Sequence, residues 1–414
     1  MLWKGIDLSQ QRNFQLNKQW FVFFGAITAV AIGTGVHDSI FNNFLADTFQ
    51  LHADARGWLE FPRELPGFLV VLMSGILCMV SITRIGVVAT GVFATGMIGM
   101  SLLGTHLPTM VFMMATASAG MHLLMPVNGS VVLALSDEHN RGRRMGQAAA
   151  VGTTGTVIGT GLIWLFFDRT HPPYAAGFLC VSGLVVVAGC FYGMLHIPGL
   201  HQPRARLIVR RRFKLYYLLE LLAGARKQIF LTFGPWVLIK VYDLPAASMA
   251  KLLFIAAVIG IFFQPAAGAA VDRFGERAIM IVDGLILFVV CLGYGYAQQA
   301  APSHDTAQVL ASACYILDQL LFSLSSARSV YISRLTENHQ ELNATLALGV
   351  SINHIASMTI PAFAGLLWVS FGYERVFLAA AILALCCAAA SSFVPGKGRL
   401  ALAGQAAVMP ENRD

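Results

Sequence analysis

The chain has 414 residues, of which 57% are hydrophobic and only 12% are charged. Soluble domains average roughly a quarter charged residues, so a soluble protein of this composition could not cover its surface with polar groups. Composition therefore disfavours an ordinary soluble protein and indicates a chain embedded in lipid.

About twelve apolar stretches of roughly 20 residues follow one another, the length of a helix that crosses about 30 Å of hydrocarbon. They lack the period-two alternation of a membrane β-barrel strand, and backbone amides in lipid must be satisfied within their own element. We therefore predict an all-α membrane protein with twelve transmembrane helices. The predicted spans are 18–46, 57–81, 85–105, 108–135, 145–167, 174–196, 215–240, 247–271, 278–299, 307–328, 343–369 and 373–394.

The first span carries Asp38 and Asn42, which are four residues apart and share one helix face. No removable signal peptide is expected before this span. An ionisable residue deep in a membrane helix costs roughly 2.5–3.5 kcal/mol on insertion scales and usually faces a cavity or a partner. Asp38 could therefore bind a proton, a cation or a cationic substrate group. The structural alternative is a hydrogen bond to a neighbouring helix.

The second span opens with Glu60, Arg63 and Glu64, which can meet on one side of a helix. One interpretation is a proton-coupling carboxylate held by Arg63. The other is an ion-pair set whose charged ends reach the membrane interface.

The fourth span holds His122 and Asn128 around Pro126. A lone membrane histidine is more often a packing or hydrogen-bonding residue, yet it could titrate near neutrality. Small residues recur in the fifth span at a spacing that lets helices pack closely. They are Gly152, Gly155, Gly159 and Gly161.

The seventh span carries the adjacent pair Arg226 and Lys227. Too few residues follow before Lys240 to cross the bilayer, so both are expected inside the membrane rather than beside it. Adjacent residues point about 100° apart, so one can face a cavity while the other pairs with a neighbouring helix. Asp38 and an anionic substrate are both candidate partners.

The tenth span carries Asp318 near its middle and Arg328 towards its end. We expect Asp318 to line a binding site and Arg328 to anchor the helix at the membrane interface. The eleventh span holds Asn353 and His354 before Pro361, another polar site at a helix kink.

The formal net charge of +7 follows a loop pattern. With a cytoplasmic N-terminus, the opposite loops carry few basic residues, such as Arg56 and Arg169, so the pattern predicts both termini in the cytoplasm of a multi-pass inner-membrane protein. A nucleic-acid partner would need a soluble basic face, which this arrangement does not supply. The cytoplasmic loops would carry Lys4, Arg12, Lys18, Arg84, Arg141, Arg143, Arg144, Arg204, Arg206, Arg210, Arg211, Arg212, Lys214, Arg273, Arg277, Arg334, Lys397 and Arg399.

The longest polar stretch divides the chain into halves. We expect an N-terminal six-helix bundle over 1–196, a cytoplasmic linker over 197–214, and a C-terminal six-helix bundle with a short tail over 215–414. Part of the linker is expected to form an interfacial helix with Arg210 to Arg212 towards lipid headgroups. Two halves related by an axis along the membrane normal are a recurrent transporter design, with the site between them.

The corner after the eighth span carries a motif. Gly268, Asp272, Arg273, Gly275 and Arg277 resemble the cytoplasmic loop signature of the major facilitator superfamily. The resemblance implies two six-helix bundles and a conformational latch formed by Asp272, Arg273, Gly275 and Arg277. Simple topology-setting charge is the alternative role.

Two further observations bear on the resemblance. Gly372 and Tyr373 followed by Phe377, and the run Asn353, Pro361 and Gly365, are also similar to that family. The corner after the second span departs from the signature, since Thr83 stands where the family has an aspartate, so the latch is expected mainly in the second half.

The combined expectation is a secondary active transporter of a small polar or anionic or zwitterionic organic solute, working by alternating access with a coupling proton. The alternatives are a drug or metabolite efflux antiporter and, from another class, a non-transporting receptor or scaffold. We expect a monomer that is not an enzyme, because the chain has no Walker loop and no soluble domain for catalysis. No cofactor or metal site is expected, since Cys-x-x-Cys and Cys/His clusters are missing from the sequence. The candidate substrate- or proton-binding residues are Asp38, Asn42, Arg63, Glu64, His122, Arg226, Lys227, Asp318 and Asn353.

Overall fold

The computed structural model describes residues 8–72, 77, 79–137, 140–197, 199–200 and 209–396. Within these ranges every regular element is a helix, which confirms the predicted fold class. Ten helices in the described part of the chain are long and apolar enough to cross a membrane. Contacts between helices divide the chain into two compact units.

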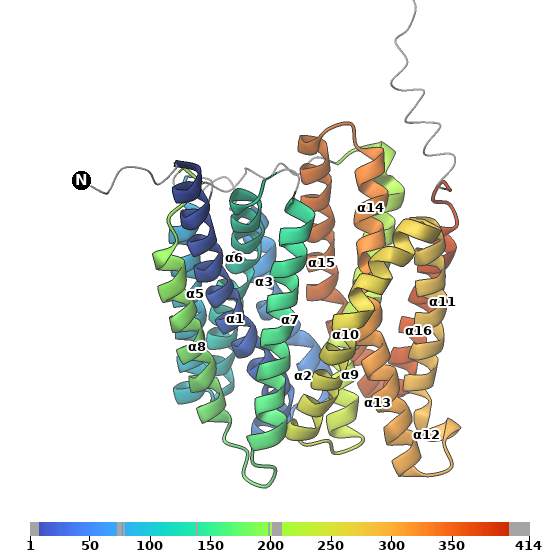
Figure 1. Cartoon of the computed structure of the whole chain (residues 1–414). Coiled ribbons are helices and arrows are strands. Elements are labelled where there is room, and N and C mark those ends of the chain that lie inside the picture. Colours follow the sequence, from blue (N-terminus) through green and yellow to red (C-terminus); the bar gives the residue numbers. More distant parts are fainter. Residues whose placement is uncertain are drawn as a thin grey trace, which may run out of the picture. The chain divides into compact units, whose positions relative to one another are not determined.

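The first unit takes in the described residues of Met1–Gln50, Pro62–Arg204 and Leu244–Ala257. Its long helices stand side by side (Figure 1). Helix α1 packs against α7 and α8, while α5 packs against α6 and α8. The helices are α1 (Leu8–Phe49), α5 (Ile82–Leu103), α6 (Leu107–Leu135), α7 (Arg141–Phe166) and α8 (Tyr174–Met194), with most of α3 (Glu60–Leu72) and the beginning of α10 (Ala246–Phe274).

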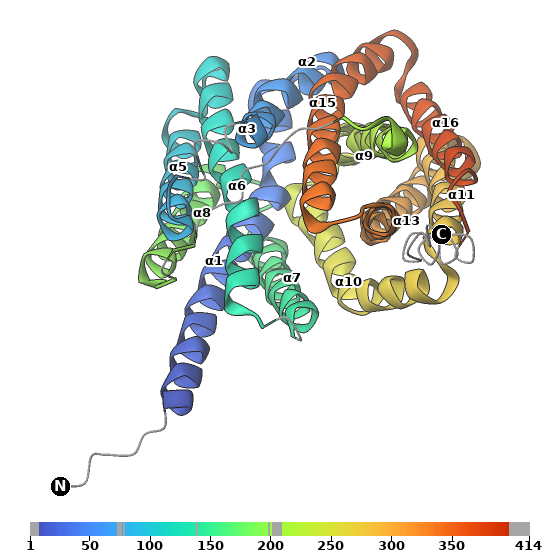
Figure 2. The ribbon, with the colours of Figure 1, turned by 90° about the horizontal axis from the view of Figure 1, so that it is seen from above.

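The second unit takes in the described residues of Leu51–Phe61, Ala205–Asp243 and Val258–Asp414. Seen from above, α9 stands between α15, α16 and α13 (Figure 2). Besides the end of α10, this unit contains α2 (Ala53–Trp58), η1 (Arg211–Phe213), α9 (Lys214–Lys240), α11 (Glu276–Gly295), α12 (Ala297–Ala300), α13 (His304–Leu321), η2 (Phe322–Ser325), α14 (Ser326–Leu335), α15 (His339–Phe371) and α16 (Tyr373–Ser391).

Two predicted spans are not among the ten apolar helices. The span 57–81 corresponds to α2 and α3, and residues 73–76 and 78 of it lie outside the described part. The span 215–240 matches α9 closely, but its polar side chains lower the mean hydropathy of that helix. Residues 198 and 201–208 of the predicted linker, and the tail from 397 onwards, also lie outside the described residues.

Two segments that belong to one half of the chain by sequence pack with the other half in the structure. Helix α2 packs against α15 in the second unit, where a Cβ atom on Gly57 would lie 2.1 Å from the carbonyl oxygen of Pro361. The beginning of α10 joins the first unit, where the rings of Phe254 and Trp164 are 5.2 Å apart. The predicted division of the chain at the linker therefore does not account for two segments. Helix α2 packs in the second unit, and the beginning of α10 packs in the first unit.

The fifth span packs as closely as its glycines predict. A Cβ atom on Gly159 of α7 would lie 2.2 Å from the carbonyl oxygen of Ile32, and one on Gly35 of α1 would lie 2.8 Å from that of Thr156. Backbones approach this closely only where both helices present small residues.

Large apolar side chains remain on the outside of both units. Soluble proteins rarely expose apolar patches of this extent, whereas lipid tails cover such side chains without cost. The distribution agrees with transmembrane helices. Examples are Phe21, Phe112, Phe166, Phe262, Val309 and Phe363.

Candidate functional site

Helix α9 carries the densest set of buried polar side chains among the described residues. Leucine, alanine, arginine and lysine, all strong helix formers, dominate its first half. From Glu220 to Thr232 the helix rises about 18 Å, which is more than half the thickness of a bilayer core. Buried polar groups over this length exceed what anchoring at an interface requires. They are Glu220, Arg226, Gln228 and Thr232.

Arg226 forms an ion pair with Asp318 near the end of α13. The two side chains are only 7% and 5% exposed. Because a guanidinium does not lose its proton in proteins, Arg226 needs a permanent acceptor when buried. Sequence analysis selected both residues separately, and the structure brings them together.

One end of α9 holds a second pair, between Glu220 and Arg328. The Nε atom of Arg328 lies 3.0 Å from Oε1 of Glu220. The side-chain nitrogen Nδ2 of Asn353 donates a hydrogen bond to Oε2 of Glu220 at 2.6 Å. The expected interface anchor Arg328 is therefore an internal ion-pair partner, with a side chain only 13% exposed. Asn353, a predicted site residue, joins this group.

A third buried group joins α9 to α2 and the first turn of α3. Nη1 of Arg56 lies 2.6 Å from Oε1 of Glu60, and the Gln228 side chain donates to Oε2 of Glu60 at 3.0 Å. The Arg56 guanidinium also lies 5.8 Å from the ring centroid of Trp236. Sequence analysis assigned Arg56 to a loop. The four-residue spacing to Glu60 was the signal that could have identified the pair.

A cavity of about 30 Å³ lies beside Arg226 within the second unit. Its charged lining residues are Arg226, Lys227, Asp283 and Arg328. The Lys227 ammonium lies 5.4 Å from the ring centroid of Phe322, which also lines the cavity. Sequence analysis missed Asp283, although a single carboxylate in the otherwise apolar span 278–299 was a readable signal.

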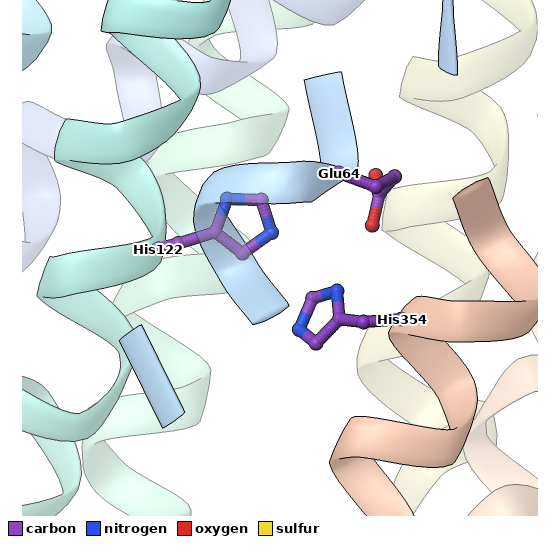
Figure 3. A group of neighbouring side chains, drawn as sticks. All are labelled: Glu64, His122 and His354. Atoms are coloured by element: carbon purple, nitrogen blue, oxygen red, sulfur yellow. The ribbon is translucent and has the colours of Figure 1, made fainter. Parts of the chain in front are cut away.

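The first unit gathers Arg63, Glu64 and His122. Nη2 of Arg63 lies 3.1 Å from Oε1 of Glu64, and ligand atoms of Glu64 and His122 lie within 4.8 Å of each other. Ser118 donates to the carbonyl oxygen of Arg63, and its hydroxyl oxygen lies 3.1 Å from Nδ1 of His122. Figure 3 shows Glu64 on α3 and His122 on α6; His354, in the same view, belongs to α15 of the second unit.

The predicted pair on the first span is less enclosed. The Asp38 side chain is 61% exposed, and its Oδ1 lies 3.0 Å from Nδ1 of His37. Asn42 is half-buried. The neighbouring Asn43 is buried and donates to the carbonyl oxygen of Leu244 at 2.8 Å. Asp38 therefore lies on the surface of its unit, in contrast to Asp318.

The predicted latch lies where α10 ends and α11 begins. Gly275 has φ = +83° and ψ = +154°, a conformation that is essentially reserved for glycine. Asp272, Arg273 and Arg277 are exposed. At this corner the buried Glu276 forms an ion pair with the exposed Arg334, at 3.0 Å, and sequence analysis did not single it out.

The end of the linker contacts acidic residues; much of the segment in which an interfacial helix was predicted, residues 201–208, lies outside the described residues. The described part contains only the short helix η1. Arg212 donates to Glu337 at 2.5 Å and to Glu341, while Nε of Arg210 lies 3.1 Å from Oε1 of Glu341. Hydrogen bonds to these carboxylates raise the pKa of Arg212. The linker is thereby attached to the beginning of α15.

Comparisons with solved structures show the fold. The nucleoside transporter NupG is 15% identical with a TM-score of 0.73, over 90% of this chain and 98% of that one. A D-xylose-proton symporter is 17% identical with a TM-score of 0.68, over 92% and 98%. A bacterial homologue of the human lysosomal transporter Spinster is 12% identical with a TM-score of 0.66, over 94% and 98%.

Comparison with curated protein sequences gives no match. The family model described as Major Facilitator Superfamily matches residues 23–340, well over half of the chain. With the helical fold and the transporter-like structures, this match confirms the resemblance carried by the corner after the eighth span. The chain belongs to the major facilitator superfamily of multi-pass membrane transporters.

Proposed function

We propose that this protein is a secondary active transporter that moves a small polar organic solute by alternating access, driven by a proton gradient. It functions as a monomer in the cytoplasmic membrane, with both termini in the cytoplasm, and catalyses no covalent reaction. The positive-inside pattern of the loops supports the orientation.

The observation that carries the proposal is the buried pair Arg226 and Asp318 on the polar helix α9. Replacing a buried ion pair by packed hydrophobic residues is often neutral or stabilising by about 1–4 kcal/mol. Stability alone therefore gives no reason to retain these charges within a membrane bundle. Ionisable groups inside the membrane characteristically mark substrate and proton pathways.

The charge content of the second unit favours a polar cargo. Guanidinium, carboxylate and amide groups recognise hydroxyl, carbonyl and carboxylate groups of a solute through directional hydrogen bonds. A cavity for a bulky lipophilic compound would be mostly apolar. Since the similar structures include a nucleoside transporter and a D-xylose-proton symporter, nucleosides and pentoses are the first substrates to test.

The test is uptake by purified protein in proteoliposomes with an alkaline interior. We expect labelled uridine or D-xylose, or a labelled amino acid or carboxylate, to accumulate, and a protonophore to abolish the accumulation. Asp318→Asn should lose accumulation. Asp305→Asn, an identical change at an exposed position in the first turn of α13, should retain it.

Three outcomes would contradict the proposal. Label entry no faster than into empty liposomes, together with saturable binding, would indicate the receptor or scaffold alternative. Uptake that ignores the pH gradient would refute proton coupling. Proton-driven extrusion of a lipophilic dye, with none of the polar solutes moved, would indicate the efflux antiporter.

A further inference from the structure

Asp283 of α11 is half-buried, and its oxygen Oδ1 has no hydrogen-bond partner among the described residues. This oxygen is shielded from solvent at the cavity beside α9. An ionised carboxylate can accept about four hydrogen bonds, and an acceptor shielded from water without a donor is destabilising. The group is therefore poorly satisfied in its charged form.

The charged groups around Asp283 come from each neighbouring helix. Arg226 and Lys227 lie on α9, Arg328 on α14 and Asp318 on α13. Cys387 of α16 is an uncharged thiol in the cavity wall. Glu220 is the partner of Arg328. Protonation of Asp283 removes one negative charge from this set and so makes it more positive by one charge.

We infer that Asp283 is the proton-binding residue of this transporter, and that a proton on its Oδ1 makes the cavity more positive by one charge. A more positive cavity attracts the electronegative groups of a polar solute, which couples proton loading to substrate binding in the same unit. This inference rests on the proposed function for its transport step, whereas proton binding at Asp283 stands on the cavity alone.

The other candidate carboxylates are less suited to releasing and rebinding a proton. Asp318 and Glu220 accept hydrogen bonds from arginines, and protonation would weaken a charge-assisted contact. Asp283 Oδ1 has no such bond to lose. Once protonated, the carboxyl group gains an O–H donor that can reach the cavity.

The cavity also offers a way for the proton to arrive. Its volume of about 30 Å³ has room for about two water molecules, and the polar lining can hold them by hydrogen bonds. A proton passes along such waters onto Oδ1 and leaves by the reverse step. The transfer creates and breaks only O–H bonds, so no further reactant is needed.

The direct test is infrared difference spectroscopy of the purified protein in lipid during a pH titration. Protonated carboxyl groups have a C=O stretch separate from that of carboxylates, and a carboxyl that takes its proton from water shifts this band to lower frequency in deuterated solvent. We expect one such titrating band in the wild type, its loss in Asp283→Asn, and its retention at a shifted position in Asp283→Glu. Asp305→Asn is the matched control and should leave the band unchanged.

An unchanged band in Asp283→Asn would overturn the assignment. If that variant does not elute as a folded protein, Asp283→Glu decides, because an unshifted band then refutes a carboxyl at this position. In proteoliposomes, Asp283→Asn should lose uridine or D-xylose accumulation but keep exchange of labelled for unlabelled solute, since exchange needs no proton release. Wild-type protein that titrates but transports nothing would refute the proposed function alone, and accumulation by Asp283→Asn would refute the inference alone.

Discussion

Breaking the Arg226–Asp318 pair tests the electrostatics of α9 most directly. Removing one partner of a buried ion pair typically costs about 3–5 kcal/mol, because the remaining charge stays desolvated. The two side chains are only 7% and 5% exposed, so the full cost for a buried ion pair applies to this one. We expect Asp318→Asn and Arg226→Met each to lower the free energy of unfolding by about 3–5 kcal/mol at neutral pH.

The two single variants should respond to pH in opposite ways. After Arg226→Met, the carboxyls of Asp318 and Asp283 remain near each other and can take up protons, so the loss of stability should shrink as the pH falls. After Asp318→Asn, Arg226 stays charged at every accessible pH. Its loss should not shrink, and should grow if Asp283 becomes protonated.

Equilibrium unfolding in mixed micelles, followed by tryptophan fluorescence, measures these effects. The double variant Arg226→Met/Asp318→Leu should lie within about 1 kcal/mol of the wild type or above it. Asp318→Leu alone completes the cycle and should lose about as much stability as Asp318→Asn. The two single losses then sum to about 6–10 kcal/mol, so a double variant near the wild type means a departure from additivity of at least about 5 kcal/mol, above the usual range for contacting residues. Additive losses, or pH-independent losses in both single variants, would refute the reasoning.

Three further predictions concern other parts of the chain. In thermal melts, Gly275→Ala should lower the stability by about 1–3 kcal/mol, because Gly275 has a positive φ. Gly268 is a helical glycine with open space around it, so Gly268→Ala should raise the stability by about 0.5–1 kcal/mol. Equal effects of the two substitutions would contradict this reasoning. Hydrogen bonds from the Thr170 hydroxyl and from backbone N–H groups lower the pKa of Asp168 to about 2. The stabilisation is therefore present above the usual aspartate pKa of 3.8 and lost as pH falls through about 2, and Thr170→Val should raise the pKa of Asp168 in an NMR titration. Gly159→Leu should destabilise by about 1–3 kcal/mol or prevent folding, measured by size-exclusion chromatography and melting, since the facing carbonyl lies 2.2 Å from a Cβ there.

The helices themselves were predictable because length and apolarity are local properties. The predicted span 108–135 matches α6, which covers Leu107–Leu135, and the predicted span 373–394 begins at the first residue of α16. The tenth span was less accurate. The helical stretch that contains the predicted span 307–328 continues to Leu335 and includes the 3₁₀ turn η2. The serines of this turn cause no change in hydropathy that would have shown where one helical segment ends and the next begins.

The partners of the buried charges were not predictable. Arg226 and Asp318 each stood out as ionisable residues in apolar surroundings, but they are 92 residues apart. Periodicity gives the face and the depth of a side chain within its helix, and it does not identify which other helix lies opposite. Arg56 was missed for a related reason, since the six-residue helix α2 is too short to show a period.

The polar character of α9 has a consequence for how the chain enters the membrane. Each of its charges near mid-helix costs about 2.5–3.5 kcal/mol when inserted alone. The carboxylate that neutralises Arg226 is synthesised 92 residues later, which takes about 5–18 s at a translation rate of about 5–20 residues per second. We expect α9 to remain at the insertion machinery, or to lie in the interface, until α13 emerges. With a cysteine introduced into α9, which has none, ribosome-bound chains truncated before and after α13 would show this as a step in the protection of that cysteine from a water-soluble thiol reagent.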